Sequence, residues 1–236
     1  MPNPTMKTAW LSPAAAPATR GTVYGTALNY RGALAALGAA VHAAPYGSPP
    51  RAPVLYIKPR NTWIGSGSPI PLPAGHEAVL AGPALGLVIA RAARRIVPQA
   101  ALEHVLGYTL VNDVALPHDS YFRPALQQQC RDGFCAIGDE VVAAERIGNP
   151  DSLEVGVWID GIRRLTSSTA GMIRSVRQLI ADVSEFMTLR AGDLLLTGLP
   201  ADLPQVRAGQ RVAVAIEGLG RLENPVIEAA ALASGA

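Results

Sequence analysis

Short apolar segments separated by turn-forming residues are the feature that most constrains how this chain can fold. The 236 residues include 23 Gly and 20 Pro, which interrupt the apolar segments from one end of the chain to the other. Segments of this length suit β-strands better than helices. The pattern therefore predicts a β-rich α+β domain rather than a doubly wound α/β fold. The strands are expected at residues 22–28, 54–58, 85–89, 105–114, 153–159, 193–197 and 211–217.

The strongest helical pattern covers residues 170–189, where apolar residues recur with a period of 3.6. Thr169 is in position to cap the start of this helix. Shorter helices are expected at 31–37 and 98–104. The dipeptide Asp160-Gly161 stands between two strand-like segments and is typical of a tight β-hairpin turn.

The domain organisation is expected to be simple. Residues 1–20 are rich in Pro and Ala and are predicted to be a loosely structured lead-in. Residues 21–236 contain no internal repeat, low-complexity tract or linker-like boundary. A single domain of this size can bury a substantial core.

Composition excludes several classes of protein. Apolar residues make up 49% of the chain, which excludes a disordered protein. The formal net charge is only +2, and the arginines are scattered, so no nucleic-acid partner is expected. The longest apolar stretch, residues 78–90, is too short to span a membrane, so no membrane partner is expected either. Cys130 and Cys135 are read as free thiols, which predicts a cytoplasmic protein.

Common catalytic motifs are missing from the sequence, and the four histidines are too dispersed for a zinc site. The first of three polar clusters is Asn112-Asp113, at the end of an apolar strand. Burial there is costly unless the side chains are paired. Asp113 is therefore a candidate cation ligand or acid/base group. The alternative is a local cap at the end of the strand.

The other two polar clusters contain basic residues. Arg131 and Asp132 are adjacent and precede Gly133, so they form either an anion-binding clamp or a simple turn. Lys58 closes an apolar strand in a chain that otherwise contains only one lysine, Lys7. It is either a functional group or a side chain that extends its ammonium from the strand end into water.

Four segments in this order resemble the signatures of the fumarylacetoacetate hydrolase family: residues 56–62, 107–114, 131–138 and 192–198. The resemblance extends over most of the chain. It implies a β-rich roll or sandwich and an enzyme that uses a divalent cation, usually Mg²⁺. In such enzymes the cation stabilises the enolate formed when CO₂ leaves or a proton moves.

Three local details resemble one branch of the family, the N-terminal-type subunits of decarboxylase/isomerases that act in homoprotocatechuate (4-hydroxyphenylacetate) degradation. They are residues 58–62, 121–125 and 222–226. The implied substrate is a small oxo acid with two or three carboxylates. Its carboxylates are expected at Lys58, Arg123 and Arg131, with Asp132 beside them.

The chain also departs from the family pattern at the expected cation site. Two glutamates of active members fall on Gly82 and Ala84 here, so Asp113 is the one carboxylate of that set that remains. A single carboxylate is a poor site for Mg²⁺. No cofactor is therefore expected on this chain, and Mg²⁺ is assigned to active relatives or to a partner. Other polar positions of the family are replaced here by Ala33, Gln129 and Leu199.

Three hypotheses follow from the sequence. In the first, the chain is a subunit with a degenerate metal site that works with a C-terminal-type family subunit. In the second, it is a metal-free isomerase or decarboxylase that uses Asp113 as base and Arg131 as clamp. In the third, it is a purely structural scaffold that completes an oligomer and binds no small molecule. The expected protein partner is a C-terminal-type family subunit or further copies of this chain.

Overall fold

A computed structural model describes residues 6–7, 21–118, 121 and 125–233 of the chain. The strands are β1 (Met6–Lys7), β2 (Val23–Ala27), β3 (Val54–Lys58), β4 (Trp63–Ile64), β5 (Ile70–Leu72), β6 (Val79–Leu80), β7 (Pro83–Ile89), β8 (Val105–Asp113), β9 (Cys135–Ile137), β10 (Glu140–Ala143), β11 (Glu154–Ile159), β12 (Ile162–Ser168), β13 (Leu194–Leu196), β14 (Gln205–Val206), β15 (Arg211–Ile216) and β16 (Gly220–Glu228). The helices are α1 (Arg31–Ala35), α2 (Leu126–Gln129), α3 (Val176–Phe186) and α4 (Ala229–Ala233), with 3₁₀ turns η2 (Gly38–His42), η3 (Arg60–Thr62), η4 (Pro98–His104), η5 (Ala144–Arg146) and η6 (Thr169–Gly171).

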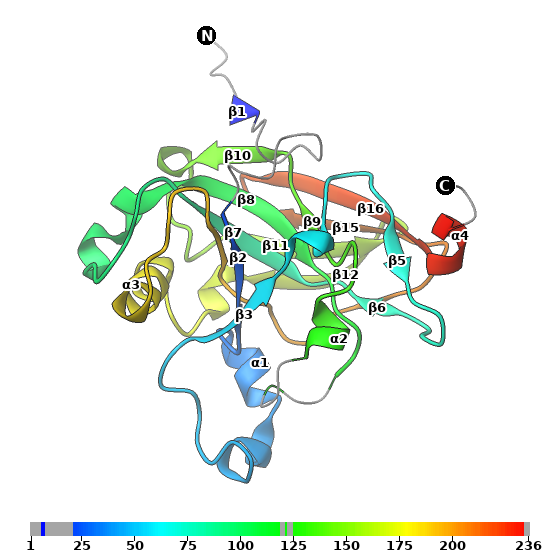
Figure 1. The fold of residues 1–236 in the computed structure, drawn as a ribbon, viewed down its shortest axis with the longest axis horizontal. Helices are drawn as coiled ribbons and strands as arrows, with labels where there is room; N and C mark the ends of the chain where they lie inside the picture. Colours follow the sequence, from blue (N-terminus) through cyan, green and yellow to red (C-terminus); the bar gives the residue numbers. More distant parts are fainter. Residues whose placement is uncertain (1–5, 8–20, 119–120, 122–124, 234–236) are drawn as a thin grey trace.

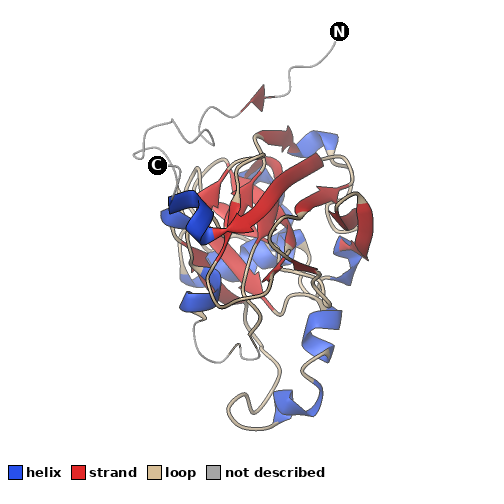
Figure 2. Cartoon of the chain, turned by 90° about the vertical axis from the view of Figure 1, so that its right-hand side faces the viewer, coloured by secondary structure: helices blue, strands red, loops and turns tan. Residues whose placement is uncertain are grey.

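The described strands form the centre of the molecule, and the helices lie around it (Figures 1 and 2). The larger sheet is mixed and has the order β1-β10-β8-β7-β13-β2-β3, with β9 paired to β8 and β4 to β9. A second sheet has the order β12-β11-β15-β16-β5, and β6 pairs with β14. This arrangement confirms the predicted β-rich α+β class. Among the described residues, no helix has the length and apolar character needed to cross a membrane.

Strand β7, in the middle of the larger sheet, is buried on both faces, which explains its continuous apolar run. Leu85, Leu87 and Ile89 point into the main core, which also contains residues of the second sheet and of α3. Ala84 and Val88 point to the opposite face and join a smaller apolar cluster. Alternate residues of a strand face opposite sides, so a strand covered on both sides needs apolar residues throughout.

The hairpin prediction is confirmed in detail. Asp160 and Gly161 have φ angles of 49° and 79° and connect β11 to β12. Positive φ at both central positions is what the tightest hairpin turns require, and Asp-Gly meets this requirement at low cost. The lead-in is described only at Met6–Lys7, which form β1 on the edge of β10.

The helix predicted at residues 170–189 is shorter in the structure, and the prediction of Thr169 as its N-cap was wrong. Helix α3 is limited to Val176–Phe186, and Ser175, not Thr169, caps its start by accepting a hydrogen bond from the Gln178 N–H. The segment before it is extended because Ile173 and Arg174 donate their backbone N–H groups to Asn29. These tertiary hydrogen bonds override the local helical periodicity.

Tyr108 should make the protein sensitive to alkaline conditions. Burial raises the pKa of this β8 phenol from 10.0 to about 12. The unfolded chain therefore loses this proton first, and stability falls as the pH rises from 10 towards 12, by about 1.4 kcal/mol per pH unit. In urea unfolding between pH 9 and 11.5, Tyr108→Phe should show a shallower loss of stability. Equal slopes for the two proteins would contradict this assignment.

Candidate functional site

Lys58 and Asp113 form a buried ion pair. Lys58 ends β3 and Asp113 ends β8, and β7, β13 and β2 lie between these strands in the order of the sheet. The sheet curls so far that the Lys58 Nζ lies 2.7 Å from Asp113 Oδ1. The exposed fractions of the two side chains are 0% and 3%. This overturns the interpretation of Lys58 as a side chain that reaches into water.

The ammonium of Lys58 has further partners in the backbone. Its Nζ donates to the carbonyl oxygens of Val114, Gln129 and Phe134 at 2.8, 2.7 and 2.9 Å. An ammonium has three N–H donors, so these acceptors and the Asp113 carboxylate fully satisfy it. A buried lysine needs such compensation because desolvation of an unpaired charge is very unfavourable.

Tyr56 forms a hydrogen bond with the second carboxylate oxygen of Asp113. Its hydroxyl donates to Asp113 Oδ2. Burial first, and then the adjacent Asp113 charge, raise the pKa of the phenol well above its ordinary value, so the phenol stays protonated as a donor. The ring fits because the paired residue on β2 is Gly25, where a Cβ would come within 2.1 Å of the Tyr56 ring.

Asn112 takes the capping role that was considered for Asp113. Its Oδ1 accepts a hydrogen bond from the Gly82 N–H at 3.0 Å, and the Asp113 N–H donates to the Gly82 carbonyl at 2.7 Å. The two interactions fix the start of β7 against the end of β8. The approach is so close that a Cβ at Gly82 would lie 2.3 Å from the Asp113 carbonyl oxygen.

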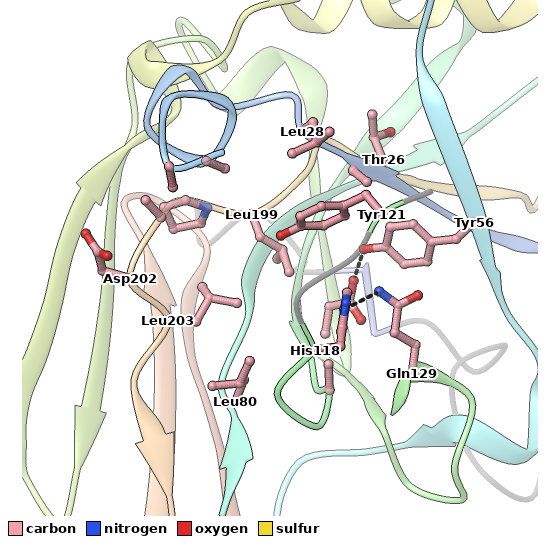
Figure 3. Close-up of a pocket in the computed structure, with 17 residues that line it drawn as sticks. Thr26, Leu28, Tyr56, Leu80, His118, Tyr121, Gln129, Leu199, Asp202 and Leu203 are labelled. Carbon is pink, nitrogen blue, oxygen red and sulfur yellow. Dashed lines mark hydrogen bonds between the residues drawn. The ribbon is translucent and has the colours of Figure 1, made fainter. Parts of the chain in front are cut away.

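A cavity of about 210 Å³ opens beside this cluster (Figure 3). Strand β2, helix α1, the end of β8 and the loop after β13 supply its walls. The lining residues are Thr26, Ala27, Leu28, Ala33, Ala36, Tyr56, Leu80, Asp113, Ala115, His118, Tyr121, Gln129, Leu199, Pro200, Ala201, Asp202 and Leu203.

One wall of the cavity is polar. The Gln129 side-chain nitrogen and His118 Nε2 are 3.4 Å apart, and the Tyr121 ring packs edge-on against the His118 ring at a centroid distance of 5.5 Å (Figure 3). The Tyr121 N–H donates to the Tyr46 hydroxyl, which connects this wall to the segment that follows η2. The wall can therefore offer hydrogen bonds to a small molecule.

The predicted site residues are only partly brought together. Asp113 lines the cavity, and Lys58 lies behind it. Arg131 and Asp132 do not line it: Arg131 Nε donates to the Gln127 carbonyl, and Asp132 accepts from the Asn61 side chain. These contacts fit the turn alternative for this dipeptide. Arg123 lies outside the described residues.

Several lining residues were missed in the sequence. Tyr56 had a recognisable signal, because it lies two residues before Lys58 and strand residues with this spacing share a face. Tyr121 begins the segment 121–125 that resembles one branch of the family, but no role was assigned to it. Thr26 and His118 had no local signal, because they reach the cavity through the tertiary fold.

The cation that the family resemblance implies does not fit the residues present. Gly82 and Ala84 provide no side-chain oxygen, and both oxygens of Asp113 are engaged by Lys58 and Tyr56. Among the described residues, no group of three or more His, Cys, Asp or Glu side chains is placed to hold a metal ion. Mg²⁺ and Mn²⁺ prefer sites with several oxygen ligands.

A ligand-sized, largely apolar cavity with a few polar groups is typical of domains that act on small molecules. The chain belongs to the fumarylacetoacetate hydrolase family, because the model described as fumarylacetoacetate (FAA) hydrolase C-terminal matches residues 22–227. It is 42% identical over 209 residues to the 4-hydroxyphenylacetate degradation bifunctional isomerase/decarboxylase of Escherichia coli. This match covers 89% of the chain and 48% of that protein, so the chain spans about half the length of this relative.

Solved structures agree with this assignment. The 2-hydroxyhepta-2,4-diene-1,7-dioate isomerase of Mycobacterium marinum is similar with a TM-score of 0.72 and 29% identity, covering 89% of this chain and 75% of that one. Fumarylpyruvate hydrolase of Pseudomonas aeruginosa, solved with Mn²⁺ and pyruvate, gives a TM-score of 0.74 and 26% identity, with coverage of 89% and 90%. The fold of this chain is therefore the fold of its family.

Proposed function

We propose that this chain is the N-terminal-type subunit of a 5-oxopent-3-ene-1,2,5-tricarboxylate decarboxylase/2-hydroxyhepta-2,4-diene-1,7-dioate isomerase in 4-hydroxyphenylacetate catabolism. Its partner would be a C-terminal-type family subunit with an intact acidic site. The match to about half of the E. coli bifunctional protein supports a two-part enzyme. The observation that carries the proposal is that Lys58 and Tyr56 engage both oxygens of Asp113.

The chemistry of this reaction needs stabilisation of an enolate. A divalent cation, Mg²⁺ in this proposal, would supply it in the partner by withdrawing charge from the 2-oxo-carboxylate group. In this chain, Lys58 neutralises Asp113 at Oδ1 and the Tyr56 hydroxyl binds Oδ2, so both carboxylate oxygens are already engaged. The chain would therefore contribute assembly and cavity shape rather than the cation site.

The geometry favours this proposal over a metal-free enzyme. A base at Asp113 would need a free carboxylate oxygen within reach of the substrate proton, and both oxygens are engaged. The anion clamp of that alternative, Arg131, does not line the cavity.

Reconstitution tests the proposed function. The chain alone should show no Mg²⁺-dependent decarboxylation or isomerisation, whereas a mixture with the C-terminal-type subunit from the same genome should show both. Ultraviolet absorbance follows the conjugated substrates, and CO₂ release follows decarboxylation. Size-exclusion chromatography should show the two chains together. Full Mg²⁺-dependent turnover by the isolated chain would disprove the degenerate-site proposal.

The same assay distinguishes the proposed subunit from a non-catalytic scaffold that does not affect turnover. In that case the partner alone would match the turnover of the mixture. Asp113→Asn removes the counter-ion of the buried Lys58, so size-exclusion chromatography must first show that the variant still assembles. The assembled variant should keep the turnover of the mixture, because the partner carries the chemistry. Loss of turnover in a variant that still assembles would place the reaction at Asp113 instead.

A further inference from the structure

The Tyr56–Asp113 pair gives the cavity a wall that accepts hydrogen bonds. The Tyr56 hydroxyl donates its single proton to Asp113 Oδ2, and both residues line the cavity. With this bond formed, the phenol oxygen and the carboxylate keep lone pairs and have no further proton to donate. Two acceptor oxygens therefore lie side by side in this part of the wall.

The strand pairing directs Tyr56 to the cavity side of the sheet. Tyr56 pairs with Gly25 on β2, and directly paired strand residues face the same side of a sheet. Ala27 shares that face because it lies two residues after Gly25, and it lines the cavity. Figure 3 shows the Tyr56 hydroxyl pointing away from β3 and toward Tyr121. The phenol oxygen is therefore placed where a ligand in the cavity can reach it.

The positive charge of Lys58 is not available to such a ligand. Its side chain is 0% exposed, and its ammonium is engaged by Asp113 and by backbone carbonyl groups. None of the described lining residues is Lys or Arg. A carboxylate would place its charge against the oxygens of Tyr56 and Asp113 without a compensating cation. An uncharged molecule that donates hydrogen bonds is favoured instead.

The remaining walls indicate the rest of the ligand. Four leucines give the cavity an apolar lining: Leu28, Leu80, Leu199 and Leu203. A cavity of about 150 Å³ can hold benzene, and this one measures about 210 Å³, so a ring with a small substituent fits. Gln129 and Tyr121 also line the cavity and carry groups that can donate to a carbonyl oxygen.

We propose that this cavity binds a small uncharged carboxamide with an apolar body, and that the amide NH₂ group donates to the Tyr56–Asp113 pair. An NH₂ group has two N–H donors, which match two neighbouring acceptor oxygens better than the single O–H of an alcohol. The site lies beyond the proposed reaction, which uses carboxylated substrates at the partner's site. It is therefore tested on this chain without the partner.

Three ligands of nearly the same shape separate the contributions of the donor and of the charge: benzamide, acetophenone and benzoate. They differ in the group on the carbonyl carbon, which is NH₂, CH₃ or O⁻. Isothermal titration of the purified full chain in EDTA should detect benzamide, with acetophenone about tenfold weaker because it has no donor. Benzoate should be weaker still. No benzamide binding, or binding of either other ligand as tight as that of benzamide, would overturn the proposal.

A matched pair of alanines on α1 tests the location of the ligand. Ala33 lines the cavity, whereas Ala35 is exposed and does not line it. Ala33→Leu should fill part of the cavity and weaken the binding of benzamide and of acetophenone by about tenfold. Ala35→Leu should leave both unchanged. Unchanged binding in Ala33→Leu, or an equal loss in both variants, would overturn the assignment to this cavity.

The triple variant Lys58→Met/Asp113→Leu/Tyr56→Phe tests the hydrogen-bonding groups. It replaces the polar cluster by apolar side chains of similar size, and circular dichroism first shows whether it is folded. In the folded variant the preference for benzamide over acetophenone should disappear, because both acceptor oxygens are gone. A retained preference would overturn the assignment to Tyr56 and Asp113. If the variant does not fold, the ligand series and the alanine pair still decide the proposal.

Discussion

Replacement of Lys58 by Met should destabilise the protein by about 3 to 5 kcal/mol, because Asp113 would remain buried without its counter-ion. The Lys58 side chain is 0% exposed and Asp113 3%, so water cannot replace the lost partner. The variant also leaves the carbonyl oxygens that Lys58 binds without this donor. Urea unfolding measured by circular dichroism gives the difference in free energy of unfolding.

An exposed ion pair provides the matched control for Lys58. Arg91 and Glu103 lie 2.8 Å apart, with side chains 58% and 66% exposed. Arg91→Met should cost less than about 1 kcal/mol, because surface ion pairs contribute little. The double variant Lys58→Met/Asp113→Asn should recover part of the lost stability. A cost below about 1 kcal/mol for Lys58→Met alone would contradict a buried, mutually dependent pair.

Gly82→Ala should be the second strongly destabilising change, by about 1 to 3 kcal/mol. The new Cβ would lie 2.3 Å from the Asp113 carbonyl oxygen and 2.9 Å from the Leu199 side chain. The carbonyl belongs to β8, so β7 and β8 would have to separate. Thermal unfolding of the wild type and of Gly82→Ala measures the loss of stability.

Gly148→Ala is the control, because nothing lies within 4 Å of a Cβ at that position. It should change stability by less than about 0.5 kcal/mol. If Gly82→Ala were as stable as the wild type, the start of β7 would be able to move away from β8 at little cost, which would contradict the prediction. The expected clash also means that no side chain larger than that of glycine fits at position 82 while β7 and β8 keep this spacing.

Local patterns predicted strands β2, β3, β7, β8, β11, β13 and β15, but not the other described strands. Strand β3 was predicted at 54–58 and is observed at Val54–Lys58, because flanking prolines and apolar residues limit it locally. The turn at Asp160-Gly161 was predictable for the same reason. The start of α3 was not, because Asn29, far away in sequence, holds Ile173 and Arg174 in an extended conformation.

The candidate site was only partly predictable. Asp113 and Lys58 were recognised separately as polar residues at the ends of apolar strands. Their contact depends on the curl of the larger sheet, which no short segment of sequence reports. Tyr56 and Thr26 were missed because each looks like an ordinary strand residue until the cavity beside it is known.

The contacts of the Lys58 ammonium also bear on the rates of folding and unfolding. They join residues separated by 56, 71 and 76 positions, so closing them requires long loops. We expect contacts of this kind to form after the rate-limiting step, when the sheet has already curled. Their stabilisation then slows unfolding and leaves the folding rate nearly unchanged. One lysine side chain would in this way prolong the lifetime of the native state.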